Sequence, residues 1–204
     1  MAQYDVWAVN PTSDDDYFRA SAAIAASGSI ALLKNDVGQY GTGYKVSITS
    51  DGADANKTFT ITGVKVGING ADGVVTETVT GPSATVVYST NYYTRVNSIS
   101  ISAASTGGIK IGYGGDLAFP RTRIKQVLYL ASSTEGSITF TAQPNNTVIL
   151  KLFTPADGTA NDAMVPPEGI LTTKSNSGRG DIAVMTLDQV SKVKIGRAVQ
   201  QVCR

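Results

Sequence analysis

Lys57-Thr-Phe-Thr-Ile-Thr-Gly-Val-Lys-Val66 decides the fold, because apolar side chains and threonines alternate along this stretch. Alternate residues of a strand share one face, so Phe59 and Ile61 are predicted to reach a buried face while the intervening threonines point outward. The apolar alternation shifts by one position at Gly63. The two valines that follow rejoin the buried face only if Gly63 sits at a β-bulge.

The same alternation recurs through most of the chain, and the segments between the alternating runs are rich in turn residues. Asn69-Gly-Ala-Asp-Gly73, between two such runs, is the clearest hairpin signal. The spacing of seven short strands before residue 114 indicates an antiparallel β-sandwich. The predicted strands are Ile30–Leu33, Tyr44–Thr49, Lys57–Val66, Val74–Thr80, Ala84–Ser89, Thr94–Ser102 and Ile109–Tyr113, followed by Ile124–Ala131, Ser137–Ala142, Thr147–Phe153, Ile170–Thr173, Ile182–Leu187 and Lys192–Ile195.

The sequence therefore predicts an all-β protein with a short N-terminal helical arm. We expect the arm over residues 1–27, an antiparallel β-sandwich domain over 28–114 and a second, smaller β domain over 115–204. The boundary is placed at the glycine-rich stretch Gly112-Tyr-Gly-Gly-Asp116. A second sheet packed on the first domain is the alternative to a separate second domain.

The arm is predicted from a change in composition at the start of the chain. Ser13 is a candidate N-cap, and Asp14-Asp15-Asp16 would complement the helix dipole. The alanine-rich stretch Tyr17–Ala26 is then expected to be helical. Such a short helix needs a surface to dock on. It either reaches a neighbouring subunit or caps its own β domain.

Composition narrows the function classes. Of 204 residues, 16% are charged, and the formal net charge is +1, so no electrostatic footprint for nucleic acid is present. No segment approaches the roughly 20 apolar residues of a membrane span, and the first residues do not resemble a signal peptide. The single cysteine, Cys203, cannot form an internal disulfide, which fits synthesis in a reducing compartment.

The chain contains no histidine, which removes the commonest general base and the commonest metal ligand. We therefore predict no catalytic, cofactor-binding or metal-binding residues. The aspartates at 14–16 are interpreted as a helix start and not as a cation site, because they lack the spacing of a calcium loop. An acid-pair hydrolase stays a third alternative. Its candidate carboxylates are well separated in sequence: Glu77, Asp116, Glu135, Glu168 and Asp181.

The densest aromatic cluster lies within Tyr88–Arg95. Adjacent residues of a strand point to opposite faces, so one of Tyr92 and Tyr93 is expected to be buried and the other exposed. An exposed tyrosine beside an arginine is typical of an interface anchor, and a tyrosine covering a sheet edge is the equal alternative. The predicted inter-subunit contact residues, from this cluster and from the arm, are Trp7, Tyr17, Phe18, Tyr92, Tyr93 and Arg95.

Four stretches carry a resemblance to a known group of proteins: Thr58-Phe-Thr-Ile-Thr-Gly63, Gly73-Val-Val-Thr-Glu-Thr-Val-Thr-Gly-Pro82, Tyr92-Tyr-Thr-Arg-Val-Asn-Ser-Ile-Ser-Ile101 and Gly108-Ile-Lys-Ile-Gly112. Together they resemble a β module of tailed-bacteriophage structural proteins, over roughly residues 44 to 113. The resemblance implies a non-enzymatic virion component. It also implies synthesis in the host cytoplasm and no catalytic residues to carry over.

The favoured interpretation is a capsid decoration (cement) protein at the capsid surface, whose partners are the major capsid protein and copies of itself, as a homotrimer. The trimer rests on family analogy alone. No nucleic-acid or membrane partner is expected. A tail, neck or fibre-associated subunit is the first alternative. The second is a carbohydrate-binding β module for host recognition, which would need exposed aromatic side chains on a sheet face.

Overall fold

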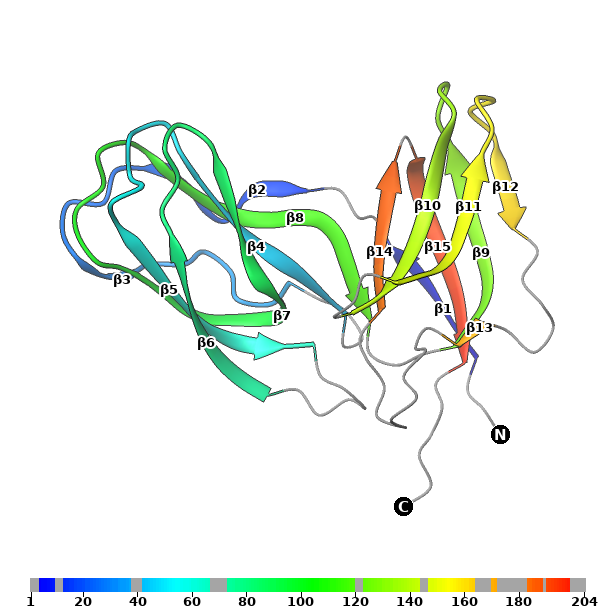
Figure 1. Ribbon diagram of the computed structural model, residues 1–204, viewed down its shortest axis with the longest axis horizontal. Helices are drawn as coiled ribbons and strands as arrows, with labels where there is room; N and C mark the ends of the chain where they lie inside the picture. The colour runs from blue at the N-terminus through cyan, green and yellow to red at the C-terminus, as the bar shows by residue number, and fades with distance from the viewer. Residues whose placement is uncertain are drawn as a thin grey trace, which may run out of the picture. The chain divides into compact units, whose positions relative to one another are not determined.

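A computed structural model of the chain shows an all-β protein, as predicted (Figure 1). No helix occurs among the residues that the structure describes, and hence none that could cross a membrane. The structure describes residues 4–9, 13–37, 42–66, 73–119, 123–143, 147–163, 170–171, 183–188 and 190–198.

The strands divide into two compact units. The β2–β8 unit extends from β2 to Leu117 of β8, and the β9–β15 unit contains β1 and the strands from β9 onward. Residues 1–27 consequently contribute to both units. The strands of the β2–β8 unit are β2 (Asp14–Ala22), β3 (Gly28–Ile30), β4 (Gly43–Ser50), β5 (Thr58–Lys65), β6 (Gly73–Thr80), β7 (Val86–Ile101) and β8 (Ile109–Phe119).

Within the β2–β8 unit the strand order is β8-β4-β7-β5-β6, with β2 paired to β8 and β3 paired to β7. The two strands predicted at Ala84–Ser89 and Thr94–Ser102 form one long strand, β7. Its first half pairs with β4 and its second half with β5, both antiparallel. The long β7 thus links the two halves of the sandwich-like unit.

The predicted irregularity at Gly63 is present, but its geometry differs from the prediction. The β5–β6 register is continuous, whereas the β5–β7 register shifts between Thr62 and Gly63. The extra residue is Asn97 of β7, not a residue of β5. Because β5 keeps its alternation, Gly63 lies on the buried face and Val64 is only half-buried. Val66, beyond the strand, is buried.

Gly63 is required by the ring of Tyr93. A Cβ atom at Gly63 would lie 2.4 Å from the carbonyl oxygen of Arg95 and 2.7 Å from the Tyr93 ring. Real Cβ atoms do not approach other atoms so closely. The Tyr93 ring of β7 therefore fills the space that a side chain at Gly63 would occupy on the buried face of β5.

The helix expected over Tyr17–Ala26 is wrong, because residues up to Ala22 belong to strand β2. β2 pairs with β8 at Asp14, Arg19 and Ala22, with irregular register between these points. Phe18 is fully buried in the core. Tertiary pairing and burial of one aromatic side chain thus override the helix propensity of the alanines.

The core of the β2–β8 unit draws on six of its seven strands. The bulge in β7 matters here, since Val96 and Ile99 lie three residues apart and are both buried. The buried cluster consists of Phe18, Ile30, Val46, Ile48, Phe59, Ile61, Tyr93, Val96, Ile99, Ile101, Ile109 and Ile111.

The β9–β15 unit is built in two parts. The first part is a sheet in the order β1-β15-β9-β12, in which β13 also pairs with β9. In the second part, β10 lies between β11 and β14 and pairs with both. Buried apolar residues such as Val127 of β9 and Phe140 of β10 form its core. The strands are β1 (Tyr4–Val9), β9 (Arg123–Ala131), β10 (Gly136–Ala142), β11 (Thr147–Thr154), β12 (Ala160–Ala163), β13 (Ile170–Leu171), β14 (Ala183–Asp188) and β15 (Val190–Ala198).

Candidate functional site

The predicted contact residues near the N-terminus occupy different environments. Trp7 lies in β1 opposite Ile195 of β15, and its side chain is outside the described residues. Tyr17 is half-buried, and its hydroxyl donates a hydrogen bond of 2.8 Å to the carbonyl oxygen of Asp36. The Lys34 ammonium lies 4.3 Å from the centre of the Tyr17 ring. Phe18, as a core residue, presents no surface.

Tyr92 and Tyr93 were expected to be divided between a buried and an exposed face, and this is wrong. Tyr92 is 7% exposed and Tyr93 is 0% exposed. Tyr93 joins the core, and Tyr92 is buried on the other face, where it meets Lys45. Burial, together with the nearby Asp116 carboxylate, raises the pKa of Tyr92 to about 12. Of the three contact residues predicted from this cluster, only Arg95 is exposed, and its Nε donates to Asn97 Oδ1 at 2.9 Å.

A wide bulge in β7 organises the face that carries Tyr92. Lys45 pairs with Tyr92 and Ser47 pairs with Tyr88, so residues 89–91 stand opposite the single residue Val46. Both tyrosines therefore share one face of the sheet with Lys45. Bulges of this kind occur next to functional sites, where they redirect side chains.

The bulge is held by two side chains, Ser89 of β7 itself and Glu77 of β6. The Ser89 hydroxyl accepts a hydrogen bond of 2.8 Å from the amide of Val46 and donates one of 2.8 Å to the carbonyl of Asn91. The Glu77 carboxylate of β6 accepts hydrogen bonds from the amides of Thr90 at 2.8 Å and Asn91 at 3.0 Å. The Asn91 side-chain amide also donates to Glu77. These bonds fix the position of Tyr88, next to the bulge.

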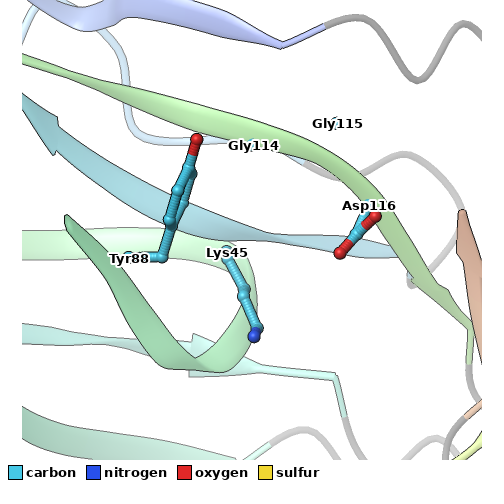
Figure 2. A pocket seen from close by; sticks show the side chains of 5 residues that line it. All are labelled: Lys45, Tyr88, Gly114, Gly115 and Asp116. Carbon is cyan, nitrogen blue, oxygen red and sulfur yellow. The ribbon is translucent and has the colours of Figure 1, made fainter. Parts of the chain in front are cut away.

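A pocket of about 290 Å³ opens on this face (Figure 2). Tyr88 of β7, Lys45 of β4 and Asp116 of β8 line it together with the backbone of Gly114 and Gly115. Tyr88 is 49% exposed. A Cβ at Gly114 would lie 3.0 Å from Cε1 of Tyr88, so the ring rests directly on the β8 backbone. The pocket combines an aromatic ring, a cation and an anion on a stiff sheet.

The two charged groups of the pocket are not joined to each other. Lys45 and Asp116 form no ion pair or hydrogen bond with the described residues, and the Lys45 ammonium lies 5.3 Å from the centre of the Tyr92 ring. Ser47, the cross-strand partner of Tyr88, is buried, and its hydroxyl has no hydrogen-bond partner within the described part of the chain. The charged groups of Lys45 and Asp116 therefore have no ionic partner within the described part of the chain.

A second charged cluster, at the turn after β4, differs from the pocket because its charged groups are buried and paired. Asp54 is completely buried and pairs with Lys57. It also accepts hydrogen bonds from the Ser50 hydroxyl at 2.6 Å and from the Thr106 amide at 2.8 Å. Burial alone would raise the pKa of Asp54, but the hydrogen bonds from Lys57, Ser50 and Thr106 outweigh it and hold the pKa well below its ordinary value. Every group in this cluster has a partner, so its role is structural.

The aspartates at 14–16 do not start a helix, because they open strand β2. Their carboxylates lie within 4.8 Å of one another, and Asp15 forms an exposed ion pair of 3.0 Å with Lys110. The other carboxylates considered from the sequence occupy separate places wherever the structure describes them. Glu77 holds the β7 bulge, Asp116 lines the pocket and Glu135 is exposed in the β9–β15 unit, while Glu168 and Asp181 lie outside the described residues.

Strand β6 presents the second feature of interest, an open sheet edge. The strand order of the unit ends at β6, and no strand among the described residues pairs with its outer edge. Val74, Thr76, Thr78 and Thr80 alternate along its exposed face, and Val74 is 66% exposed. Natural proteins usually protect such an edge with charges, prolines or bulges, and the exposed face of β6 has none of these.

The β9–β15 unit has an exposed aromatic side chain of its own. A register shift between Phe140 and Thr141 in the β10–β11 ladder places Val148, Lys151 and Phe153 on one face of β11. Phe153 is 78% exposed, with the Lys151 ammonium 5.2 Å from its ring centre. Phe153 was not among the contact residues predicted from the sequence.

No protein-family model and no curated protein matches this chain.

Proposed function

We propose that the protein is a non-enzymatic structural subunit of a bacteriophage virion, most specifically a capsid decoration (cement) protein. In this role it binds the major capsid protein and further copies of itself, as a homotrimer on the capsid surface, after synthesis in the host cytoplasm. The sequence resemblance provides the virion context. The four resembling stretches fall on β5, β6, β7 and β8 of one unit.

The open edge of β6 is the observation that carries the proposal. The backbone donors and acceptors of this eight-residue strand that point away from β5 are paired with no described strand, and they lie beside an exposed face of valine and threonine. A strand of this kind is a template for pairing with another chain. An assembly that covers β6 uses the edge productively, whereas a free monomer would be prone to aggregation.

Phe153 provides a second contact point that fits the same role. An aromatic side chain that is largely exposed and flanked by a lysine is typical of an interface anchor. A subunit with a pairing edge on one unit and an aromatic anchor on the other can bridge two neighbours. Bridging neighbours is what stabilises a shell.

The experiment is electron cryomicroscopy of the particles that co-purify with the protein, with wild type and an edge-blocked variant. Thr76→Lys with Thr78→Lys places charges on the exposed face of β6. Ser98→Lys is the matched control, because Ser98 is exposed but lies on the interior strand β7. We expect density on the outer capsid surface for wild type and for the control, and strongly reduced occupancy for the edge-blocked variant.

Other outcomes discriminate between the alternatives. Density confined to the tail or neck would overturn the decoration role and favour a tail-associated subunit. Full occupancy of the edge-blocked variant would remove β6 from the contact. A protein that stays monomeric and binds no particle would overturn the virion proposal.

A further inference from the structure

We propose that the pocket between Tyr88, Lys45 and Asp116 binds a neutral pyranose sugar, such as a single terminal residue of a glycan. This binding activity goes beyond the structural role proposed above. It uses a different surface, since none of the pocket residues lies on β6 or β11. Either proposal can therefore fail without the other.

The Tyr88 ring offers a surface on which a sugar ring can stack. Tyr88 is half exposed although it rests on the backbone of Gly114, so the ring is fixed in place while part of its surface stays open. The face of an aromatic ring carries partial negative charge. It attracts the weakly positive C–H hydrogens on the apolar face of a pyranose. A fixed, half-exposed ring at the wall of a pocket suits this stacking.

Lys45 and Asp116 offer charged groups that can hydrogen-bond to the hydroxyls of a sugar. Asp116 offers carboxylate oxygens that accept hydrogen bonds from sugar hydroxyls, and Lys45 offers an ammonium group that donates to hydroxyl oxygens. Figure 2 shows Lys45 and Asp116 leaving different strands, with the Lys45 ammonium directed away from the Tyr88 ring. Their charges cancel, so the pocket has no net preference for an ionic ligand. A polyhydroxylated neutral ring satisfies both groups at once.

The size of the pocket limits the ligand. A volume of about 290 Å³ lies just below the usual range for ligand sites, which begins near 300 Å³. One sugar ring is therefore the expected occupant, and not an oligosaccharide. For so small and exposed a site we expect a dissociation constant of about 1 mM. Several copies on one assembly would raise the effective affinity.

The site also depends on the shape of β7. Because residues 89–91 of β7 stand opposite a single residue of β4, the partners of Tyr92 and Tyr88, which are Lys45 and Ser47, lie only two residues apart. The bulge thereby brings Tyr88, Tyr92 and Lys45 onto one small area of the sheet. Because Ser89 and Glu77 fix the bulge, the arrangement is preorganised before any ligand binds.

The test is a titration of the full chain, labelled with ¹⁵N, followed by nuclear magnetic resonance. The probes are the methyl pyranosides of glucose, galactose, mannose and N-acetylglucosamine, each added to tens of millimolar. Glucuronate and glycine betaine serve as the anionic and zwitterionic comparisons. We expect saturable shifts of the Gly114 and Gly115 amide resonances with at least one methyl pyranoside.

Variants locate the binding. Tyr88→Ala should weaken the affinity roughly tenfold through loss of stacking, whereas Tyr88→Phe should retain it. Asp116→Asn should weaken the affinity by about tenfold through loss of charged hydrogen bonds. Phe153→Ala is the matched control, because it removes another exposed aromatic side chain outside the pocket, and it should leave binding unchanged.

Three results would overturn the proposed sugar site. No saturable shift with any methyl pyranoside would exclude the site. Binding of glucuronate or betaine alone would show that the pocket takes a different class of ligand. Shifts that persist unchanged in Tyr88→Ala, with the variant still folded by its amide spectrum, would place any sugar binding elsewhere.

Discussion

The β2–β8 unit contains two lysine–aspartate combinations that behave in opposite ways. Asp54 and Lys57 lie three residues apart in one turn, are paired with each other and are enclosed by further hydrogen bonds. Lys45 and Asp116 come from two strands, face a pocket and are not joined. A buried charge must be paired to be tolerated, whereas a charge at an open pocket stays available for a ligand. The comparison separates charges that hold the fold from charges that can bind.

Breaking the buried pair should give the largest effect. Asp54→Ala leaves the Lys57 ammonium buried without its partner and also removes the acceptor for Ser50 and Thr106. We expect the free energy of unfolding to fall by about 3–5 kcal/mol. Urea unfolding, with hydrogen exchange of the β4 and β5 amides to localise the effect, would measure it. A loss below about 1 kcal/mol would contradict a structural role for the network.

The buried pair also predicts how stability depends on acid. Because the folded-state pKa of Asp54 lies below its ordinary value of 3.8, its contribution is present above that value and is lost as the pH falls through the lowered folded-state pKa. The stability difference between wild type and Asp54→Asn should therefore be constant near pH 7 and shrink below about pH 4. Unfolding curves of both proteins across this range provide the measurement. A difference that grows in acid would show that the sign is wrong.

Glu77 connects the fold with the pocket, so its removal should give an intermediate effect. Glu77→Ala leaves the amides of Thr90 and Asn91 without their acceptor. We expect a loss of about 1–3 kcal/mol in the free energy of unfolding, and altered Gly114 and Tyr88 resonances because the bulge relaxes. Glu135→Ala, at an exposed carboxylate, is the control and should change neither. An unchanged pocket in Glu77→Ala would separate the bulge from the binding site.

The strands could be predicted from the sequence because a period of two is a local signal. The alternation at Phe59 and Ile61 and the turn residues between runs identify the β segments regardless of tertiary contacts. The alanine-rich stretch after Tyr17 was misinterpreted because helix propensity is also local. The burial of Phe18 and the pairing of β2 with β8, which decide the outcome, are not local.

The candidate site could not be predicted from the sequence, since its parts come from three strands. Lys45, Tyr88 and Asp116 become neighbours only through the order β8-β4-β7. The burial of both Tyr92 and Tyr93 has the same origin, because both faces of β7 are covered at that point. The one usable signal was the cluster of tyrosines in one strand. It identified the correct strand and included Tyr88, but the contact residues chosen from it were Tyr92, Tyr93 and Arg95.

The smallest effect on stability should come from separating the pocket charges. Among the described residues Asp116 and Lys45 form no ion pair or hydrogen bond, and Lys45 has only its contact with the Tyr92 ring, so Asp116→Asn and Lys45→Gln should change the free energy of unfolding by less than about 1 kcal/mol. The same two substitutions should nevertheless weaken pyranoside binding, which a structural role would not predict. Urea unfolding and the titration, carried out on the same samples, make the comparison direct. If Asp116→Asn destabilised the protein as much as Asp54→Asn does, the pocket pair would be a second structural cluster and the contrast between the two pairs would disappear.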